Sequence, residues 1–278
     1  MRKQENIKIF EDTETLCKTN SSLKQSIKNS ICNQKLILQN QRINSNNQKR
    51  YEKPANIIVS RKRTLQAASA YKNTRTAVHN FASATNPGGG VKRGSNAQEE
   101  CLCRCSGLYV CLSTQTMWDG FYFPHRQAHN PIYNDDIIYT PAVTVFKTDT
   151  EQPEIMDASA WYNVDVITCA APNLRVKNNY NGKSSYNNAK KMTNDELLKL
   201  HEKRLKRILD AALSEDDETI ILGAFGCGAF MNDPQIVAQA AKNVIREYLY
   251  SFKNIEFAVY CSPRDDRNYR IFDRVLKK

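Results

Sequence analysis

Short apolar segments alternate with helical segments from about residue 55 to residue 260, and this alternation restricts the fold more than any other feature of the sequence. The apolar runs have the length of buried strands, and strands are predicted at 56–60, 76–81, 137–146 (interrupted by Pro141), 164–170, 219–223 and 255–260. Helical patterns fall between them, at 64–72, 98–110, from 193 onward and at 233–250. Such a chain is expected to form an α/β sandwich, with helices covering a largely parallel or mixed sheet.

Residues 1–52 differ in composition from the rest of the chain. They are rich in Asn, Gln, Lys and Ser, and they contain no Gly, Pro or Trp. Leu23, Ile27, Ile31 and Leu38 suggest a helical stripe over 21–39, and the polar stretch 40–49 is typical of a linker. We therefore predict an N-terminal helical extension and linker over 1–52, dispensable for chemistry, and a catalytic domain over 53–278.

The charge and the cysteines limit the compartment and the partners. The net charge of +11 favours polyanionic partners, although a merely basic surface would look the same. The nine cysteines are scattered, and no secretory signal precedes them, so we expect free thiols in the cytoplasm. Cys101, Cys103 and Cys105 are spaced by two residues in a predicted helix, which disfavours a zinc site. His125 and His129 lie in a stretch bounded by prolines that is predicted to be a loop, and no metal role is expected for them.

Two glycine-rich loops each follow a predicted strand. The first is Asn86-Pro87-Gly88-Gly89-Gly90, and the second is 223–230, which leads to a helix begun by Asp233-Pro234. Consecutive glycines allow backbone N–H groups to turn toward an anion or a sugar oxygen, and a loop that leads into a helix suits a diphosphate. Neither loop matches the P-loop or the dinucleotide-binding pattern, so both of those nucleotide folds are disfavoured.

The triplet Gln98-Glu99-Glu100 begins after seven residues that follow the last of the three glycines. Two acidic residues at the start of a helix commonly complement its dipole, but their nearness to the glycines favours a catalytic role.

Read as one segment, NFASATNPGGGVKRGSNAQEECLCR (80–104) resembles the bacterial-type poly(ADP-ribose) glycohydrolases, which carry a GGG-x6–8-QEE pattern on a macrodomain fold. Later segments resemble the same family in the same order: YNDDIIYTPAVTVFK, VDVITCAAPN and ILGAFGCGAFMNDP. The resemblance extends from about Pro54 to the C-terminus.

The resemblance implies a three-layer αβα macrodomain, with a mixed central sheet, that hydrolyses ribose–ribose O-glycosidic bonds of poly(ADP-ribose) and releases ADP-ribose. It implies Glu100 as the general acid–base and Glu99 as the residue that holds the terminal ribose. The implied substrate-binding residues are Asn86, Gly88, Gly89, Gly90 and Gln98 at the ribose, Gly226, Cys227, Gly228 and Ala229 at the diphosphate, and Phe230 at the ribose or adenine. No metal and no cofactor are implied.

The expected partners are poly(ADP-ribose) or ADP-ribose and, as a further option, ADP-ribosylated proteins. Nucleic acid is not required, no membrane partner is expected, and a monomer is expected. One alternative is a hydrolase of mono-ADP-ribose attached to protein or nucleic acid. Another is a non-enzymatic ADP-ribose-binding macrodomain, which would need the glycine loops but not the Gln-Glu-Glu triplet. A basic nucleic-acid-binding protein is a third alternative, supported only by charge.

Overall fold

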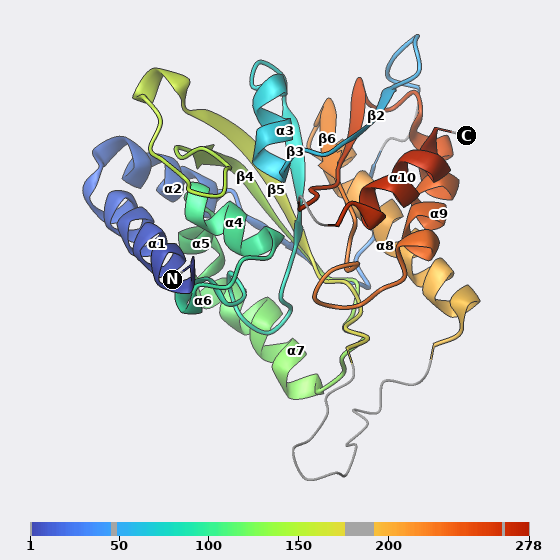
Figure 1. The fold of residues 1–278 in the computed structure, drawn as a ribbon, viewed down its shortest axis with the longest axis horizontal. Helices are drawn as coiled ribbons and strands as arrows, with labels where there is room; N and C mark the ends of the chain where they lie inside the picture. The colour runs from blue at the N-terminus through green and yellow to red at the C-terminus, as the bar shows by residue number, and fades with distance from the viewer. Residues whose placement is uncertain (1, 46–48, 176–191, 263–264, 278) are drawn as a thin grey trace.

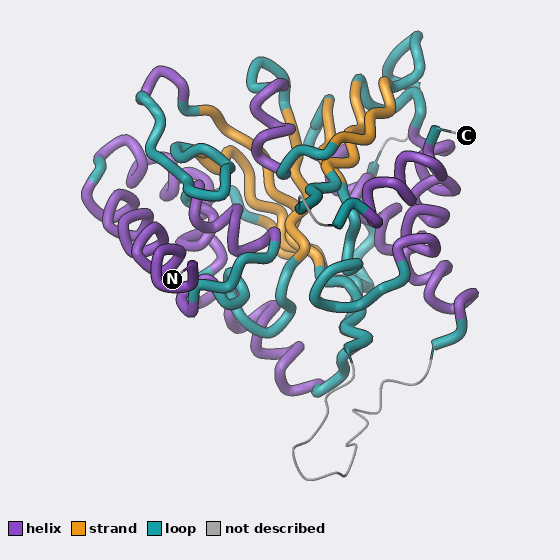
Figure 2. Tube along the Cα trace, in the orientation of Figure 1, coloured by secondary structure: helices purple, strands orange, loops and turns teal. Residues whose placement is uncertain are grey.

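The computed structural model describes residues 2–45, 49–175, 192–262 and 265–277. These residues form three layers, with helices on both faces of a seven-stranded mixed sheet (Figures 1 and 2). The strand order is β1-β4-β5-β3-β6-β7-β2. The predicted αβα architecture with a mixed central sheet is therefore confirmed.

Five neighbouring strands are parallel, and two antiparallel strands extend the sheet at one side. The parallel strands are β5 (Tyr162–Cys169), β3 (Thr76–Phe81), β6 (Thr219–Leu222), β7 (Asn254–Ala258) and β2 (Asn56–Ser60). β4 (Ile137–Val145) runs antiparallel to β5, and β1 (Lys35–Ile37) runs antiparallel to β4. The pairing of β4 with β5 shifts between Thr140 and Val143, so Pro141 interrupts the ladder as predicted.

The helices divide between the two faces of the sheet (Figure 1). One face carries α1 (Arg2–Thr19), α2 (Ser21–Cys32), α3 (Thr64–Ala68), α4 (Gln98–Cys105), α5 (Leu108–Leu112), α6 (Gln115–Met117) and α7 (Phe123–Ala128). The other carries α8 (Asn194–Ser214), α9 (Pro234–Ile245) and α10 (Arg267–Leu276). α8 begins with the predicted capping box, in which Thr193 Oγ1 accepts from Glu196 N, and Asp233 caps α9. No helix in the described part of the chain combines the length and apolarity needed to cross a membrane.

Three predicted elements differ from those observed. The helix predicted over 21–39 ends at Cys32, and Lys35–Ile37 instead forms the edge strand β1. The helix predicted over 98–110 is divided into α4 and α5. The stretch predicted as a loop around His125 is the helix α7, because Pro124 occupies its first turn, where a proline has no N–H bond to lose.

The N-terminal residues pack into the same layers as the rest of the chain. Phe10 of α1 is buried in the hydrophobic cluster that also contains Leu102 of α4. The ammonium of Lys147, which is 2% exposed, contacts Asp12 Oδ2 at 2.7 Å and Thr13 Oγ1 at 2.8 Å. Composition suggested a boundary at residue 52, but these contacts join residues from both sides of it. They argue against the dispensability of residues 1–52, and truncation tests it.

Candidate functional site

A cavity of about 370 Å³ opens where the parallel strands end. The segments that follow β2, β3, β6 and β7 all contribute to its wall, at the carboxyl edge of the sheet. Open α/β sheets bind their ligands at this edge. Both glycine-rich loops identified in the sequence lie here, so sequence segments far apart in the chain form one site.

The first glycine loop presses against both predicted catalytic carboxyl groups. Gly88 and Gly89 have φ angles of +62° and +59°, which side-chain-bearing residues rarely adopt. A Cβ atom on Gly89 would lie 2.7 Å from Glu100 Oε1 and 3.0 Å from Glu99 Oε2. Glycine is therefore required at position 89 for two reasons, the backbone conformation and the space that the carboxyl groups fill.

Glu100 is held by backbone groups on both sides. Its Oε1 accepts a hydrogen bond from Gly90 N at 2.8 Å, and its Oε2 accepts one from Ala97 N at 3.0 Å. Ala97 is the N-cap of α4, so Glu100 fills the helix-capping role and also lines the cavity. The capping and catalytic interpretations of the sequence are thus compatible, because one side chain joins the glycine loop to the helix.

Glu99 is the more deeply buried of the two carboxyl groups, at 3% exposure. Its Oε2 accepts from Ser83 N at 2.7 Å, and its Oε1 lies 3.4 Å from Asn80 Nδ2. Burial raises the pKa of Glu99 to about 8, the Ser83 N–H opposes this rise, and the neighbouring Glu100 adds to it. Glu99 therefore keeps its proton to a higher pH than an exposed glutamate does.

Gln98 joins the start of α4 to the end of β3. Its Oε1 accepts from Phe81 N at 2.9 Å, and its Nε2 donates to the carbonyl of His79 at 2.7 Å. The same amide nitrogen donates to Thr64 Oγ1 at the start of α3. Because every amide atom of Gln98 has a protein partner, its contribution is to fix the position of the two glutamates that follow it.

The second glycine loop forms the opposite wall of the cavity. Gly226 has a φ of +77°, and a Cβ there would lie 2.6 Å from the side chain of Ala171. Asn232 is buried, and its Nδ2 donates to the carbonyls of Gly226, Phe230 and Pro172, while its Oδ1 accepts from His201 Nε2 at 2.8 Å. Burial lowers the pKa of His201 to about 4, so this ring is neutral. The sequence analysis did not identify Asn232, whose hydrogen bonds fix the conformation of the loop.

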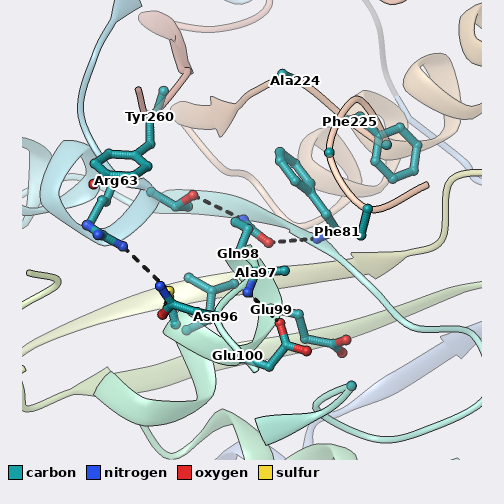
Figure 3. A pocket seen from close by; sticks show the side chains of 18 of the residues that line it. Arg63, Phe81, Asn96, Ala97, Gln98, Glu99, Glu100, Ala224, Phe225 and Tyr260 are labelled. Atoms are coloured by element: carbon teal, nitrogen blue, oxygen red, sulfur yellow. Dashed lines mark hydrogen bonds between the residues drawn. The ribbon is translucent and has the colours of Figure 1, made fainter. Parts of the chain in front are cut away.

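One end of the cavity contains residues that the sequence analysis also missed. The Arg63 guanidinium lies over the Tyr260 ring at 4.0 Å from its centroid, and Arg63 is only 9% exposed (Figure 3). Arg63 Nη2 and Asp149 Oδ1 are buried without a hydrogen-bond partner in the described part of the chain. Arg63 follows β2 and Tyr260 follows β7, so the rule that ligands bind beyond strand ends could have identified both.

The predicted site residues do not all face the cavity. Eight line it: Gly89, Gln98, Glu99, Glu100, Gly226, Gly228, Ala229 and Phe230. Four do not: Asn86, Gly88, Gly90 and Cys227. The Asn86 Oδ1, expected to contact a ribose, instead accepts from Arg126 Nη2 at 2.6 Å. Cys227 packs against the core beneath its loop, and burial raises the pKa of its thiol.

No group of three or more His, Cys, Asp or Glu side chains is arranged to hold a metal ion in the described ranges. Cys101, Cys103 and Cys105 are buried free thiols, and burial raises the pKa of each. His125 Nδ1 contacts the Phe121 carbonyl at 2.7 Å, and Nε2 contacts Asn134 Oδ1 at 2.7 Å. Both ring nitrogens of His125 thus serve the packing of α7.

Among solved structures, poly(ADP-ribose) glycohydrolase from Thermomonospora curvata is similar to the chain with a TM-score of 0.83 and 26% identity, over 98% of this chain and 99% of that one. The same enzyme bound to the inhibitor ADP-HPD gives a TM-score of 0.79, also at 26% identity, with the same coverage of both chains. Poly(ADP-ribose) glycohydrolase from Deinococcus radiodurans in complex with ADP-ribose gives 0.76 at 29% identity, over 90% of this chain and 96% of that one. Comparison with curated protein sequences gives no match.

The sequence family described as the catalytic domain of microbial-type poly(ADP-ribose) glycohydrolase (PARG) matches residues 3–148. This range contains β1 to β4, the first glycine loop and the Gln98-Glu99-Glu100 triplet. It also contains nearly all of the N-terminal residues that the sequence resemblance had left unmatched. The chain therefore belongs to the microbial-type PARG catalytic domain family, and it is a glycohydrolase.

Proposed function

We propose that this protein hydrolyses the ribose–ribose O-glycosidic bonds of poly(ADP-ribose) and releases ADP-ribose, with Glu100 as the general acid–base. One observation carries the proposal: two carboxyl groups meet at Gly89 in a cavity whose opposite wall is a glycine loop suited to a diphosphate. A reader domain would need the loop but not the buried pair of glutamates. ADP-ribose bound by the D. radiodurans relative supports the ligand class.

The chemistry of the walls suggests how an ADP-ribosyl unit would lie. The backbone of Gly226–Ala229 would face the diphosphate, as at other glycine loops that lead toward a helix. The terminal ribose would then lie between Gly89 and Phe230, next to the two glutamates. The adenine would then contact the Arg63–Tyr260 pair, in which a cation lies over an aromatic ring.

The reaction breaks the bond between the anomeric carbon of the terminal ribose and the 2′-oxygen of the preceding unit. Glu100 would give its proton to that oxygen as positive charge develops at the anomeric carbon. A water molecule then attacks the carbon, and Glu100 takes up one of its protons. Glu99 would hold a ribose hydroxyl, and its raised pKa favours the uncharged form beside Glu100.

The test compares Glu100→Gln with Glu99→Gln on poly(ADP-ribose), with chromatographic detection of free ADP-ribose. Glu100→Gln should bind ADP-ribose by calorimetry but lose at least the roughly 10²–10⁴-fold contributed by a positioned acid–base. Glu99→Gln should lose turnover through ribose positioning and should keep the fall in rate at high pH that reports the acid. Glu154→Gln makes the same chemical change at an exposed site and should behave as wild type.

Three results would contradict the proposal. Near-wild-type release of ADP-ribose by Glu100→Gln would remove its assigned role. Binding of polymer by the wild type without release would indicate a reader. Release of ADP-ribose from mono-ADP-ribosylated protein, with no action on the polymer, would indicate the alternative hydrolase.

A further inference from the structure

The proposed reaction divides a polymer into a released ADP-ribosyl unit and a departing chain. The cavity walls described above would bind the released unit, and the departing chain has not been placed. The charged side chains that line the cavity are three carboxyl groups (Glu99, Glu100 and Asp149) and Arg63. Glu100, the proposed proton donor to the leaving oxygen, is hydrogen-bonded to the first glycine loop through Gly90 N, so the departing chain would begin next to this loop. The first diphosphate of that chain lies one ribose away from the scissile oxygen. A cation on the outer side of that loop would therefore meet an anion.

Arg126 of α7 occupies this position. Its Nε donates to the Thr85 carbonyl at 2.8 Å, and its Nη2 donates to Asn86 Oδ1 at 2.6 Å. The Asn86 carbonyl in turn accepts from Gly89 N at 3.0 Å, and Gly89 touches both catalytic carboxyl groups. Neither Asn86 nor Arg126 lines the cavity, whereas Gly89 does. Arg126 is thus attached to the catalytic loop from outside.

The arginine is exposed but held in one place. Its guanidinium lies 4.9 Å from the centroid of the Trp118 ring, which restricts the side chain on one side. The buried contacts of His125 with the Phe121 carbonyl and Asn134 fix the helix that carries it. Within the described ranges no carboxylate pairs with Arg126, and its Nη1 has no hydrogen-bond partner. Among the described residues, no carboxylate neutralises the charge of this guanidinium, and its Nη1 is available to donate to a ligand.

We propose that Arg126, positioned by Trp118 and Asn86, binds the diphosphate of the departing polymer and so forms a leaving-group subsite. The inference rests on the proposed function, and it selects poly(ADP-ribose) over ADP-ribosyl groups carried by uncharged acceptors. An arginine fork matches phosphate oxygens, and because the side chain is already ordered, little entropy is lost on binding. The arginine does not take part in bond cleavage; it positions the leaving side of the substrate.

The competing explanation is that Arg126 merely braces the catalytic loop through Asn86. A brace would affect every substrate equally, because the loop contacts Glu99 and Glu100 whatever the leaving group is. A leaving-group subsite would affect only substrates that carry an anion beyond the scissile bond. The two explanations therefore predict different ratios between the rate on a substrate with an anionic leaving group and the rate on a substrate with an uncharged one.

The experiment measures kcat/KM of Arg126→Gln on poly(ADP-ribose) and on an aryl ADP-riboside, whose leaving group is small and uncharged. Glutamine removes the charge but can still donate to Thr85 or Asn86. Loss of one charged hydrogen bond should lower kcat/KM on the polymer by about tenfold, with little change on the aryl substrate. Arg126→Lys should recover part of the loss. The wild-type rate on polymer should also fall more steeply with added salt than the rate of Arg126→Gln.

Lys24→Ala, which removes an exposed cation from α2, controls for net charge and should leave both rates unchanged. Equal losses on both substrates by folded Arg126→Gln would overturn the subsite in favour of the brace. Unchanged turnover of polymer by Arg126→Gln, or an equal loss in Lys24→Ala, would also overturn it. If the wild type releases no ADP-ribose from the polymer, the proposed function itself fails, and that outcome is separate from all of these.

Discussion

Replacement of Gly89 by alanine tests whether the glycine loop and the two glutamates form one catalytic unit. The new methyl group would lie 2.7 Å from Glu100 Oε1, whereas ordinary contact begins at 3.4 Å, so the oxygen must retreat by about 0.7 Å. The obstructing atoms are the ends of flexible side chains, not backbone, so the carboxyl groups are expected to move and the loop to stay. The φ of +59° adds a strain of about 1–2 kcal/mol for a residue with a Cβ atom.

The expected result is a protein that folds, with a modest loss of stability, but turns over poly(ADP-ribose) at least about 10²-fold more slowly, since displacements of this size have such effects. Thermal melting, calorimetric titration with ADP-ribose and release of ADP-ribose would be measured on the same preparation. Binding should weaken less than turnover, because Gly226–Phe230 is untouched.

Gly94→Ala is a matched control. Gly94 also has a left-handed φ, of +70°, but the atoms nearest to a Cβ there belong to the backbone of Lys3 and not to Glu99 or Glu100. It should cost stability while its folded fraction keeps its turnover. Turnover of polymer by Gly89→Ala at the wild-type rate would show that the placement of both carboxyl groups against Gly89 does not matter for catalysis.

Three further predictions concern other parts of the molecule. The pKa of Glu99 is raised from an ordinary 4.5 to about 8 in the folded chain. Its contribution to stability is therefore complete below about pH 4.5 and is lost as the pH rises through 8. The free energy of unfolding of the wild type relative to that of Glu99→Gln, measured by urea titration, should fall over this pH range. Phe230→Ala should weaken ADP-ribose binding by about tenfold in calorimetry, since stacking contributes roughly 1–3 kcal/mol, and unchanged affinity would assign the ring to the core. A chain starting at Tyr51 should melt at a much lower temperature than the full chain because it uncovers the surface buried by Phe10 and leaves Lys147 without Asp12; full stability and turnover would restore the view of 1–52 as a dispensable extension.

The strands and the main site residues could be predicted because their signals are local. Each parallel strand from β2 onward is a compact apolar run, and the glycine loops directly follow two of them. β1 gave no such signal, because three residues after a helix become a strand only through their pairing with Ile137–Tyr139, a hundred residues later. The sequence pattern of the helix therefore continues through these residues, and the helix was predicted to extend to residue 39.

The missed site residues depend on contacts between distant segments. Arg63 belongs to the site only because β2 lies beside β7, which brings it under Tyr260. Asn86 belongs to the expected motif, but its side chain accepts a hydrogen bond from Arg126. Arg126 lies on α7, which the flanking prolines had led us to predict as a loop. Motif spacing could identify the loop, but the partner of each side chain is decided by tertiary packing.

The pairing of β2 with β7 has a consequence for the order in which the molecule can be assembled. In the part of the chain that the structure describes, residues 56–60 pair only with the strand 254–258, which is synthesised much later. Until then β2 has an open edge and no place in the sheet, and pairings so distant in sequence form slowly. The wall that joins Arg63 to Tyr260 can close only after residues 254–260 have been synthesised. A nascent chain could thus have its glutamates in place before it has a pocket able to hold a ligand.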